Sequence, residues 1–174
     1  DPEGIAVDAT RVYSRGHFPT TADRLRLYEK HAPDLAERTV AGLELGADAR
    51  RITHLIVTSC TGMYAPGLDL ELVQRCQLDP SVERTMVGFM GCYAAINALK
   101  LARHIVRSEP TSRVLVLNLE LCSLHLQQTT NLEQMLSFLV FADGCAASII
   151  SAEPVGLALD RFHVVVLPET AGLI

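Results

Sequence analysis

The sequence has no apolar stretch long enough to cross a membrane and no excess of basic residues. A transmembrane helix needs about 18 or more consecutive apolar residues, and no run in this chain approaches that length. The first residues, Asp1-Pro2-Glu3-Gly4, do not resemble a signal peptide. The formal net charge of −5 argues against a general nucleic-acid or membrane-surface binder, which needs a basic face. We therefore expect a cytoplasmic protein that does not bind nucleic acid.

Motifs for metals, disulfide frameworks and nucleotide phosphates are also missing. The chain contains neither GxGxxG after a strand nor GxxxxGK[ST], and HExxH and GxSxG are absent as well. Its cysteine count is odd and includes no CxxC pair, which indicates free thiols rather than a zinc site or a disulfide framework. We expect no metal and no bound cofactor. The five cysteines are Cys60, Cys76, Cys92, Cys122 and Cys145.

What the sequence does contain is a regular alternation of strand-like and helix-like patterns. With 174 residues, of which 49% are hydrophobic and 20% charged, it can form one domain with a substantial core. The run at residues 54–59 is apolar without clean alternation, as in strands that are covered on both faces. Alternating strands and helices predict a layered α/β fold with a mixed, largely parallel sheet covered by helices. We predict strands over residues 54–59, 82–89, 113–120, 145–151 and 157–167, the last at an edge, and helices over 68–76, 92–108 and 132–141.

The first part of the chain predicts an extended arm followed by two helices. Residues 5–12 alternate loosely and fit a short strand or an arm. A helical pattern begins at Thr20, which is a normal helix cap. Pro33 interrupts this pattern. Because proline is tolerated in a first turn, we expect a second helix to restart there and to run to Gly46.

Cys92 is the strongest candidate for chemistry. The apolar run before it meets Gly88 and Gly91, and the period of the apolar residues then changes to that of a helix. This pattern predicts a strand, a tight turn and a helix with Cys92 in its first turn, where free backbone N–H groups and the helix dipole favour a thiolate. Gly91 leaves room for a ligand. Free cysteines are often small buried core residues, so an inert Cys92 stays open as the alternative.

Three further residues stand where sites gather in α/β sheets. Glu120 and Asp143 lie at predicted strand ends or turns, although a structural carboxylate or a turn cap explains them equally well. His125, in the loop after the third strand, is the one histidine we place near a pocket. The histidines predicted to lie on a helix or a strand, in packed or solvated positions, are His54, His104 and His163.

Taken together, these motifs resemble a known family, the type III polyketide synthases, which are the chalcone and stilbene synthase group of the thiolase superfamily. The order and spacing hold from about residue 20 to residue 157, and the sequence around Cys92 is more similar to bacterial alkylpyrone and alkylresorcinol synthases than to the plant enzymes. The resemblance implies a thiolase-like α/β half. It is carried by Ile52-Thr53-His54-Leu55-Ile56-Val57, Thr61-Gly62, Pro66-Gly67, Asp79-Pro80-Ser81-Val82, Gly91-Cys92, Arg113-Val114-Leu115-Val116 with Glu120, and Phe141-Ala142-Asp143-Gly144.

The resemblance also implies a reaction and a set of site residues. Cys92 would take a starter acyl group from acyl-CoA as a thioester, and the chain would be extended by decarboxylative condensation with malonyl-CoA. Phe141 matches the family's gatekeeper between the CoA tunnel and the cavity. Ala65 stands where a side chain of one subunit of a homodimer reaches into its partner's cavity. The residues that match cavity-lining, substrate-binding positions are Cys60, Thr61, Glu120, Cys122 and His125.

This chain also departs from the family. The family's catalytic histidine and asparagine lie in a second thiolase half, and no histidine here stands in the family's histidine motif. Residues 1–174 therefore match an N-terminal thiolase-like domain with only the cysteine half of the site, which we expect to be weakly active or inactive alone. The starter, the number of extensions and the mode of cyclisation are not determined. The alternatives are a ketoacyl-ACP synthase III-like enzyme and a non-catalytic dimerisation subunit.

Overall fold

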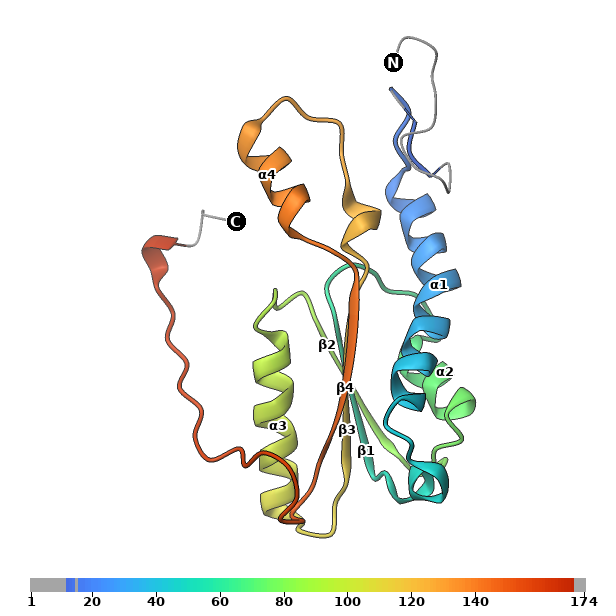
Figure 1. The fold of residues 1–174 in the computed structure, drawn as a ribbon, viewed down its shortest axis with the longest axis vertical. Coiled ribbons are helices and arrows are strands. Elements are labelled where there is room, and N and C mark those ends of the chain that lie inside the picture. Colours follow the sequence, from blue (N-terminus) through green and yellow to red (C-terminus); the bar gives the residue numbers. More distant parts are fainter. Residues whose placement is uncertain (1–11, 15, 171–174) are drawn as a thin grey trace.

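A four-stranded sheet with helices on both faces forms the centre of the computed structural model, which describes residues 12–14 and 16–170 (Figure 1). The strands are β1 (His54–Ser59), β2 (Glu83–Gly88), β3 (Val114–Glu120) and β4 (Gly144–Ile150), in the order β2-β1-β3-β4. β1 runs parallel to β2 and β3, and β4 pairs antiparallel with β3. The predicted mixed, largely parallel sheet is confirmed.

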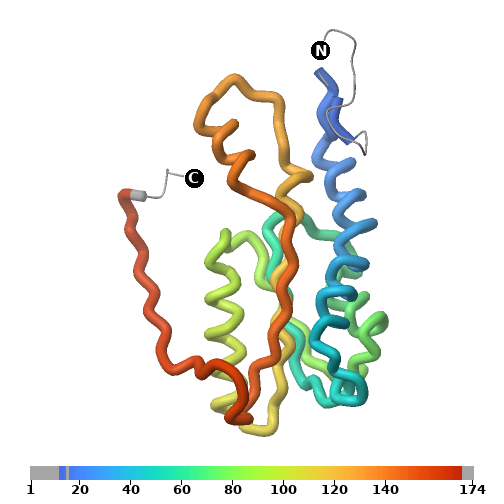
Figure 2. The backbone as a smooth tube through the Cα atoms, in the orientation of Figure 1, coloured from blue at the N-terminus to red at the C-terminus, as the bar shows by residue number. Residues whose placement is uncertain are grey.

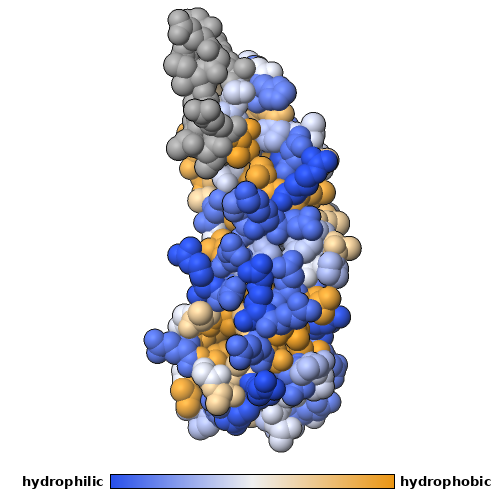
Figure 3. Space-filling model, turned by 90° about the vertical axis from the view of Figure 1, so that its right-hand side faces the viewer, coloured by the Kyte–Doolittle hydropathy of each residue, from blue (hydrophilic) through white to orange (hydrophobic). Residues whose placement is uncertain are grey.

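One face of the sheet is covered by α1 (Thr21–Ala41) and α2 (Leu68–Arg75). The buried residues of α1 include Tyr28, Ala32, Ala36 and Val40, each four residues after the last, so that they share one side of the helix. The outward side of this layer is dominated by polar side chains (Figure 3). The buried strand residues that join the same apolar cluster are Leu55, Val57, Leu115, Leu117 and Leu119.

The opposite face packs on α3 (Ala94–Ser108). Ala98, Ala102 and Val106 form a buried stripe along this helix, and they cluster with Ile56 and Val116 from the sheet. Neighbouring strand residues point to opposite faces of a sheet, which explains why β1 and β3 carry apolar residues on both faces. Small alanine side chains let α3 lie close to the strands.

The prediction of two helices around Pro33 is wrong. α1 is continuous from Thr21 to Ala41 and contains Pro33 as a buried residue. Thr20 caps it as predicted, since its hydroxyl accepts from Asp23 N and the Asp23 carboxylate accepts from Thr20 N. A proline removes one helical hydrogen bond. In α1, the apolar residues before and after Pro33 are buried against the sheet. This tertiary packing keeps the helix continuous.

The predicted edge strand at residues 157–167 is also wrong. This segment has no partner strand and is largely exposed. It turns past the end of α3 (Figure 2). Within that helix, Arg103 Nε donates to Leu159 O at 2.6 Å and Arg103 Nη2 donates to Asp160 O at 2.8 Å. A β-branched pattern forms a strand only where its backbone pairs with a sheet edge. Here the chain turns away from the edge strand β4 and is hydrogen-bonded to α3 instead. The predicted arm at residues 5–12 lies, apart from Val12, outside the described residues.

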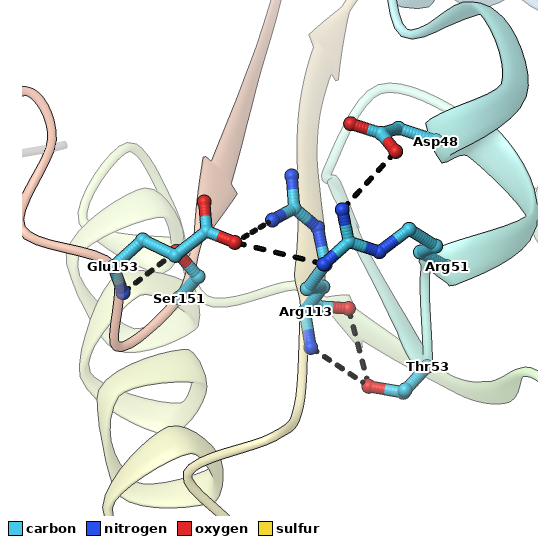
Figure 4. A network of polar contacts seen from close by, with 6 residues as sticks. All are labelled: Asp48, Arg51, Thr53, Arg113, Ser151 and Glu153. Atoms are coloured by element: carbon cyan, nitrogen blue, oxygen red, sulfur yellow. Dashed lines mark hydrogen bonds and ion pairs between the residues drawn. The ribbon is translucent and has the colours of Figure 1, made fainter.

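A polar network fixes the amino-terminal ends of the parallel strands (Figure 4). Arg113, just before β3, donates to Glu153 Oε1 at 2.6 Å, and Arg51 Nη2 lies 3.7 Å from the same oxygen. Thr53 Oγ1 accepts from Arg113 N at 3.0 Å. Arg51 also pairs with Asp48 at 3.2 Å. These contacts hold the chain after β4 against the start of β1 and β3, at the end of the sheet that is opposite to Cys92.

Within the described ranges, no helix is both long enough and apolar enough to span a membrane.

Candidate functional site

The carboxyl ends of the three parallel strands bring most of the predicted site residues to one end of the sheet. Cys60 and Thr61 directly follow β1, Glu120 ends β3, and the turn with Cys92 follows β2. This is the end at which open α/β sheets bind ligands. A short 3₁₀ helix, η2 (Cys122–His125), follows β3 and forms a further side of this region.

Cys92 lies on an exposed turn directly before α3. Ala94 N donates to Gly91 O at 3.0 Å, which closes a turn with Cys92 and Tyr93 as its central residues. The helix therefore begins two residues later than predicted. Gly91 has φ +72°, and Phe89 has φ +53°, so the chain leaves β2 through left-handed conformations that make room for this turn. The exposure removes the alternative of a buried core cysteine at Cys92.

The turn that carries Cys92 contacts the end of β1. The Cys60 thiol lies 3.9 Å from Gly91 O, within the range of a weak sulfur hydrogen bond. In the part of the chain that the structure describes, no histidine, lysine or arginine side chain is hydrogen-bonded to the Cys92 sulfur. A cavity of about 420 Å³ lies beside this turn, with Gly62, Met63 and Phe89 among its lining residues. Cys92 itself lies outside that cavity.

Glu120 is occupied by the backbone and side chains around it. Its two oxygens accept from Cys60 N at 2.9 and 3.0 Å, and Oε2 also accepts from Thr61 Oγ1 at 2.7 Å. Thr61 Oγ1 in turn accepts from Leu121 N at 2.8 Å. This carboxylate therefore joins the end of β3 to the end of β1, which fits the structural role that the sequence left open for it.

His125 and Cys122 face the same region from η2. His125 Nε2 lies 2.6 Å from Thr61 O, and because a carbonyl only accepts, this nitrogen carries the proton. Burial raises the pKa of the Cys122 thiol, and the nearby charges of Glu120, Asp143 and Cys92 raise it further.

Phe141 follows α4 (Leu132–Val140), a helix without a single buried residue. The Phe141 side chain is exposed. Phe141 lies two residues before Asp143, and the Asp143 carboxylate accepts from Ser123 N and Ser123 Oγ, both at 2.7 Å. The covalent chain therefore links Phe141 to a residue that is bonded to η2. The contacts thus bring Cys60, Thr61, Glu120 and the η2 residues together, whereas the exposed side chain of Phe141 takes no part in them.

Sequence reasoning missed two contacts behind the site. The Tyr28 hydroxyl, which is buried, donates to Ser59 Oγ at 2.8 Å, and the backbone of Gly62 lies against the Tyr28 ring. A glycine three residues after the end of a buried strand is the signal that could have indicated such a close approach.

The three histidines that were predicted on a helix or a strand do not join these contacts. His54 Nδ1 lies 2.8 Å from Thr53 Oγ1, His104 is exposed on α3, and His163 lies in the segment wrongly predicted as a strand. Over residues 12–14 and 16–170, no group of three or more potential metal ligands occurs.

Comparisons with known proteins agree on one family. Residues 10–154 match the family model described as chalcone and stilbene synthases, N-terminal domain. The chain is 38% identical over 151 residues to the alpha-pyrone synthesis polyketide synthase-like Pks18 of Mycobacterium tuberculosis, which covers 84% of this chain and 38% of that protein. This chain thus spans well under half the length of that relative.

Two solved structures share the fold. The C-terminal type III polyketide synthase domain of Steely1, a type I/III hybrid from Dictyostelium, has a TM-score of 0.72 and 34% identity, covering 77% of this chain and 38% of that one. The 1,3,6,8-tetrahydroxynaphthalene synthase of Streptomyces coelicolor, a bacterial type III polyketide synthase, has a TM-score of 0.76 and 26% identity, covering 87% of this chain and 45% of that one. The expected thiolase-like half is confirmed at the level of the fold.

Proposed function

The chain belongs to the chalcone and stilbene synthase family, and on this basis we propose that it carries the cysteine half of a type III polyketide synthase active site. Cys92 Sγ attacks the thioester carbonyl of an acyl-CoA starter, a new carbon–sulfur bond forms, and CoA leaves as its thiol. Malonyl-CoA then loses CO₂, and the resulting carbanion attacks the carbonyl of the Cys92 thioester. A carbon–carbon bond forms, the acyl carbon–sulfur bond breaks, the Cys92 thiolate is released, and the extended chain is carried by CoA. The observation that carries this proposal is the exposed position of Cys92 at the carboxyl end of the parallel strands.

The proposed site is incomplete in this chain. Thiol activation and oxyanion stabilisation each contribute orders of magnitude in rate, and the groups for both come from a second thiolase half in this proposal. The share of Pks18 that this chain spans, 38%, supports the idea. We therefore expect slow acylation of Cys92 and little further turnover.

The residues around Cys92 form part of the substrate-binding wall in this proposal. Cys60, Thr61, Cys122 and His125 come from two elements that are hydrogen-bonded to each other. Glu120 belongs to the same wall in this proposal, and its contacts with Cys60 N and Thr61 Oγ1 hold the ends of β1 and β3 together there.

We further propose that the functional unit is a homodimer that takes acyl-CoA and malonyl-CoA and needs no other cofactor. Ala65 stands at the family's position facing the partner's cavity. The strand β2 supports self-association, because it lies at the edge of the sheet and is largely exposed.

Intact-protein mass spectrometry tests the proposed acylation. After incubation with hexanoyl-CoA, the chain should gain one hexanoyl group, mapped to Cys92 by peptide analysis. Cys92→Ala should abolish the adduct, whereas Cys76→Ala, which removes a half-buried thiol on the far side of the sheet, should leave it unchanged. An adduct that forms equally on Cys92→Ala would overturn the assignment. Much faster acylation from an acyl-carrier protein than from CoA would favour the ketoacyl-ACP synthase III-like alternative.

A further inference from the structure

Ser123, in the middle of η2, is held from three directions. Its N–H donates to Asp143 Oδ1 at 2.7 Å, and its hydroxyl donates to Asp143 Oδ2 at 2.7 Å. Its carbonyl accepts from the Tyr13 hydroxyl at 2.6 Å. These partners lie 20 and 110 positions away in the sequence, so the contacts are tertiary rather than local.

The η2 helix has little to fix its shape from within. It is four residues long, and its N-cap residue, Leu121, gives no side-chain hydrogen bond. A bidentate pair of bonds to a carboxylate is short, directional and strong. The position of this short helix therefore depends on Asp143 and Tyr13 from outside, together with the contact between His125 and Thr61.

The bonds between Ser123 and Asp143 are not needed to satisfy buried polar groups. Ser123 and Asp143 are both exposed, and water could satisfy their polar groups. The packing around η2 is also loose, because a cavity of about 410 Å³ lies beside this helix. Its lining includes Tyr13, Leu27 and Leu124. The space means that η2 can move if the carboxylate is removed.

The same carboxylate fixes two walls of the candidate site. Asp143 directly precedes β4 and follows Phe141 by two residues, while Ser123 is flanked by Cys122 and lies two residues before His125. We propose that Asp143 is a positioning residue: by holding Ser123 it sets the place of Cys122 and His125 relative to Phe141, and so determines which acyl groups Cys92 accepts. The substrate part of this inference rests on the proposed function.

Alkylation of Cys122 measures the position of η2 without any need for catalysis. With N-ethylmaleimide and peptide mapping, Asp143→Ala should raise the modification rate of Cys122 by about fivefold or more, because local opening exposes the thiol. In Asp143→Asn, which keeps one acceptor oxygen, the modification rate of Cys122 should lie between those of the wild type and Asp143→Ala. Cys76, which directly follows α2, is the internal control for global unfolding and should keep its alkylation rate. Asp160→Ala removes an exposed acid elsewhere and should change nothing.

Acylation of Cys92 measures the effect on substrate choice. The ratio of the Cys92 acylation rates from hexanoyl-CoA and dodecanoyl-CoA should shift by about fivefold in Asp143→Ala and return towards the wild-type value in Asp143→Asn, since pocket shape gives discrimination of this order.

Each contrary outcome removes a distinct part of the inference. An unchanged Cys122 rate in Asp143→Ala would show that Asp143 does not position η2. A changed Cys122 rate with an unchanged ratio would overturn the role in substrate choice. An absence of Cys92 acylation in the wild-type chain would overturn the proposed function, and the Cys122 rates would still decide whether Asp143 positions η2.

Discussion

Gly62 and Tyr28 form the tightest contact between the site loop and the layer beneath it. The Tyr28 side chain is buried and hydrogen-bonded to Ser59 at the end of β1. A Cβ atom on Gly62 would lie 2.1 Å from Cγ of the Tyr28 ring, far inside van der Waals contact. The backbone after β1 can therefore reach its position beside Glu120 only because residue 62 has no side chain.

We expect Gly62→Ala to lower the free energy of unfolding by about 1–3 kcal/mol, since either the buried ring or the loop must shift. Urea unfolding followed by circular dichroism measures the change. Gly144→Ala is the matched control, because nothing lies within 4 Å of a Cβ at that position. Equal stability of the Gly62→Ala and Gly144→Ala variants would show that the ring moves aside freely.

A second prediction concerns Cys76 and pH. Burial, with a smaller contribution from Glu37, raises the pKa of this thiol to about 11. The raised pKa favours the folded state below the unfolded value near pH 9, and this contribution is lost as the pH rises towards 11. The iodoacetamide reaction rate of Cys76 should therefore keep rising up to about pH 11, with Cys76→Ser as the blank. A plateau near pH 9 would contradict the assigned burial effect.

At the scale of elements, the sequence predicts what each segment can do locally and misses what the rest of the molecule does to it. β1, β3 and α2 lie where they were predicted. A short apolar run fits a strand that is covered on both faces, and an apolar stripe fits a helix that covers the sheet, so few other structures are possible for these segments. Pro33 and residues 157–167 fail for the opposite reason. In one case, burial against the sheet holds the helix together. In the other, the segment is bonded to α3 and pairs with neither edge of the sheet.

In the candidate site too, the sequence predicts the local features and misses the tertiary contacts. The glycines beside Cys92 mark a turn before a helix, and the structure has such a turn. The contacts of Glu120 with Cys60 and of Asp143 with Ser123 join residues 60 and 20 positions apart. Nothing local in a single sequence reveals such pairs.

The third prediction concerns α4, which depends on its cap more than any buried helix does. Asn131 Oδ1 accepts from Glu133 N at 2.8 Å and from Gln134 N at 3.1 Å, and no residue of the helix is buried. Loss of an N-cap destabilises a helix by about 1 kcal/mol. Asn131→Ala should therefore speed amide hydrogen exchange in α4 by about fivefold, as measured by mass spectrometry.

Thr20→Ala provides the control for that measurement. It removes the corresponding cap from α1, but α1 is anchored by Tyr28, Ala32 and Ala36 in the core. Exchange in the middle of α1 should hardly change. If the two variants loosened their helices equally, packing would not be what protects α1.

At the scale of the whole molecule, the outer surface of α1 and α2 is largely polar (Figure 3). The end that carries Cys92 has exposed apolar residues instead. Phe89, Met90 and Tyr93 surround Cys92 in the sequence and are exposed, as is Ile96 on the first turn of α3. A large exposed apolar surface indicates contact with another protein surface. In the proposed enzyme, the second thiolase half is the natural cover for it. The exposed apolar residues of α4 are Leu132, Met135, Leu136, Leu139 and Val140.

The fourth prediction is that the exposed apolar residues of α4 drive association of the isolated chain. Leu139 and Val140 are 82% and 78% exposed, so replacing both with glutamate should reduce concentration-dependent association in sedimentation velocity without changing the melting temperature. Leu157→Glu adds charge at a residue that is 96% exposed on another segment, and should have a smaller effect. A discrete dimer that persists in the α4 variant would indicate pairing elsewhere, with the exposed edge of β2 as the first place to look. Association identical to that of the wild type in both variants would mean that the apolar side chains of α4 attract nothing, and the need for a covering surface there would fall with it.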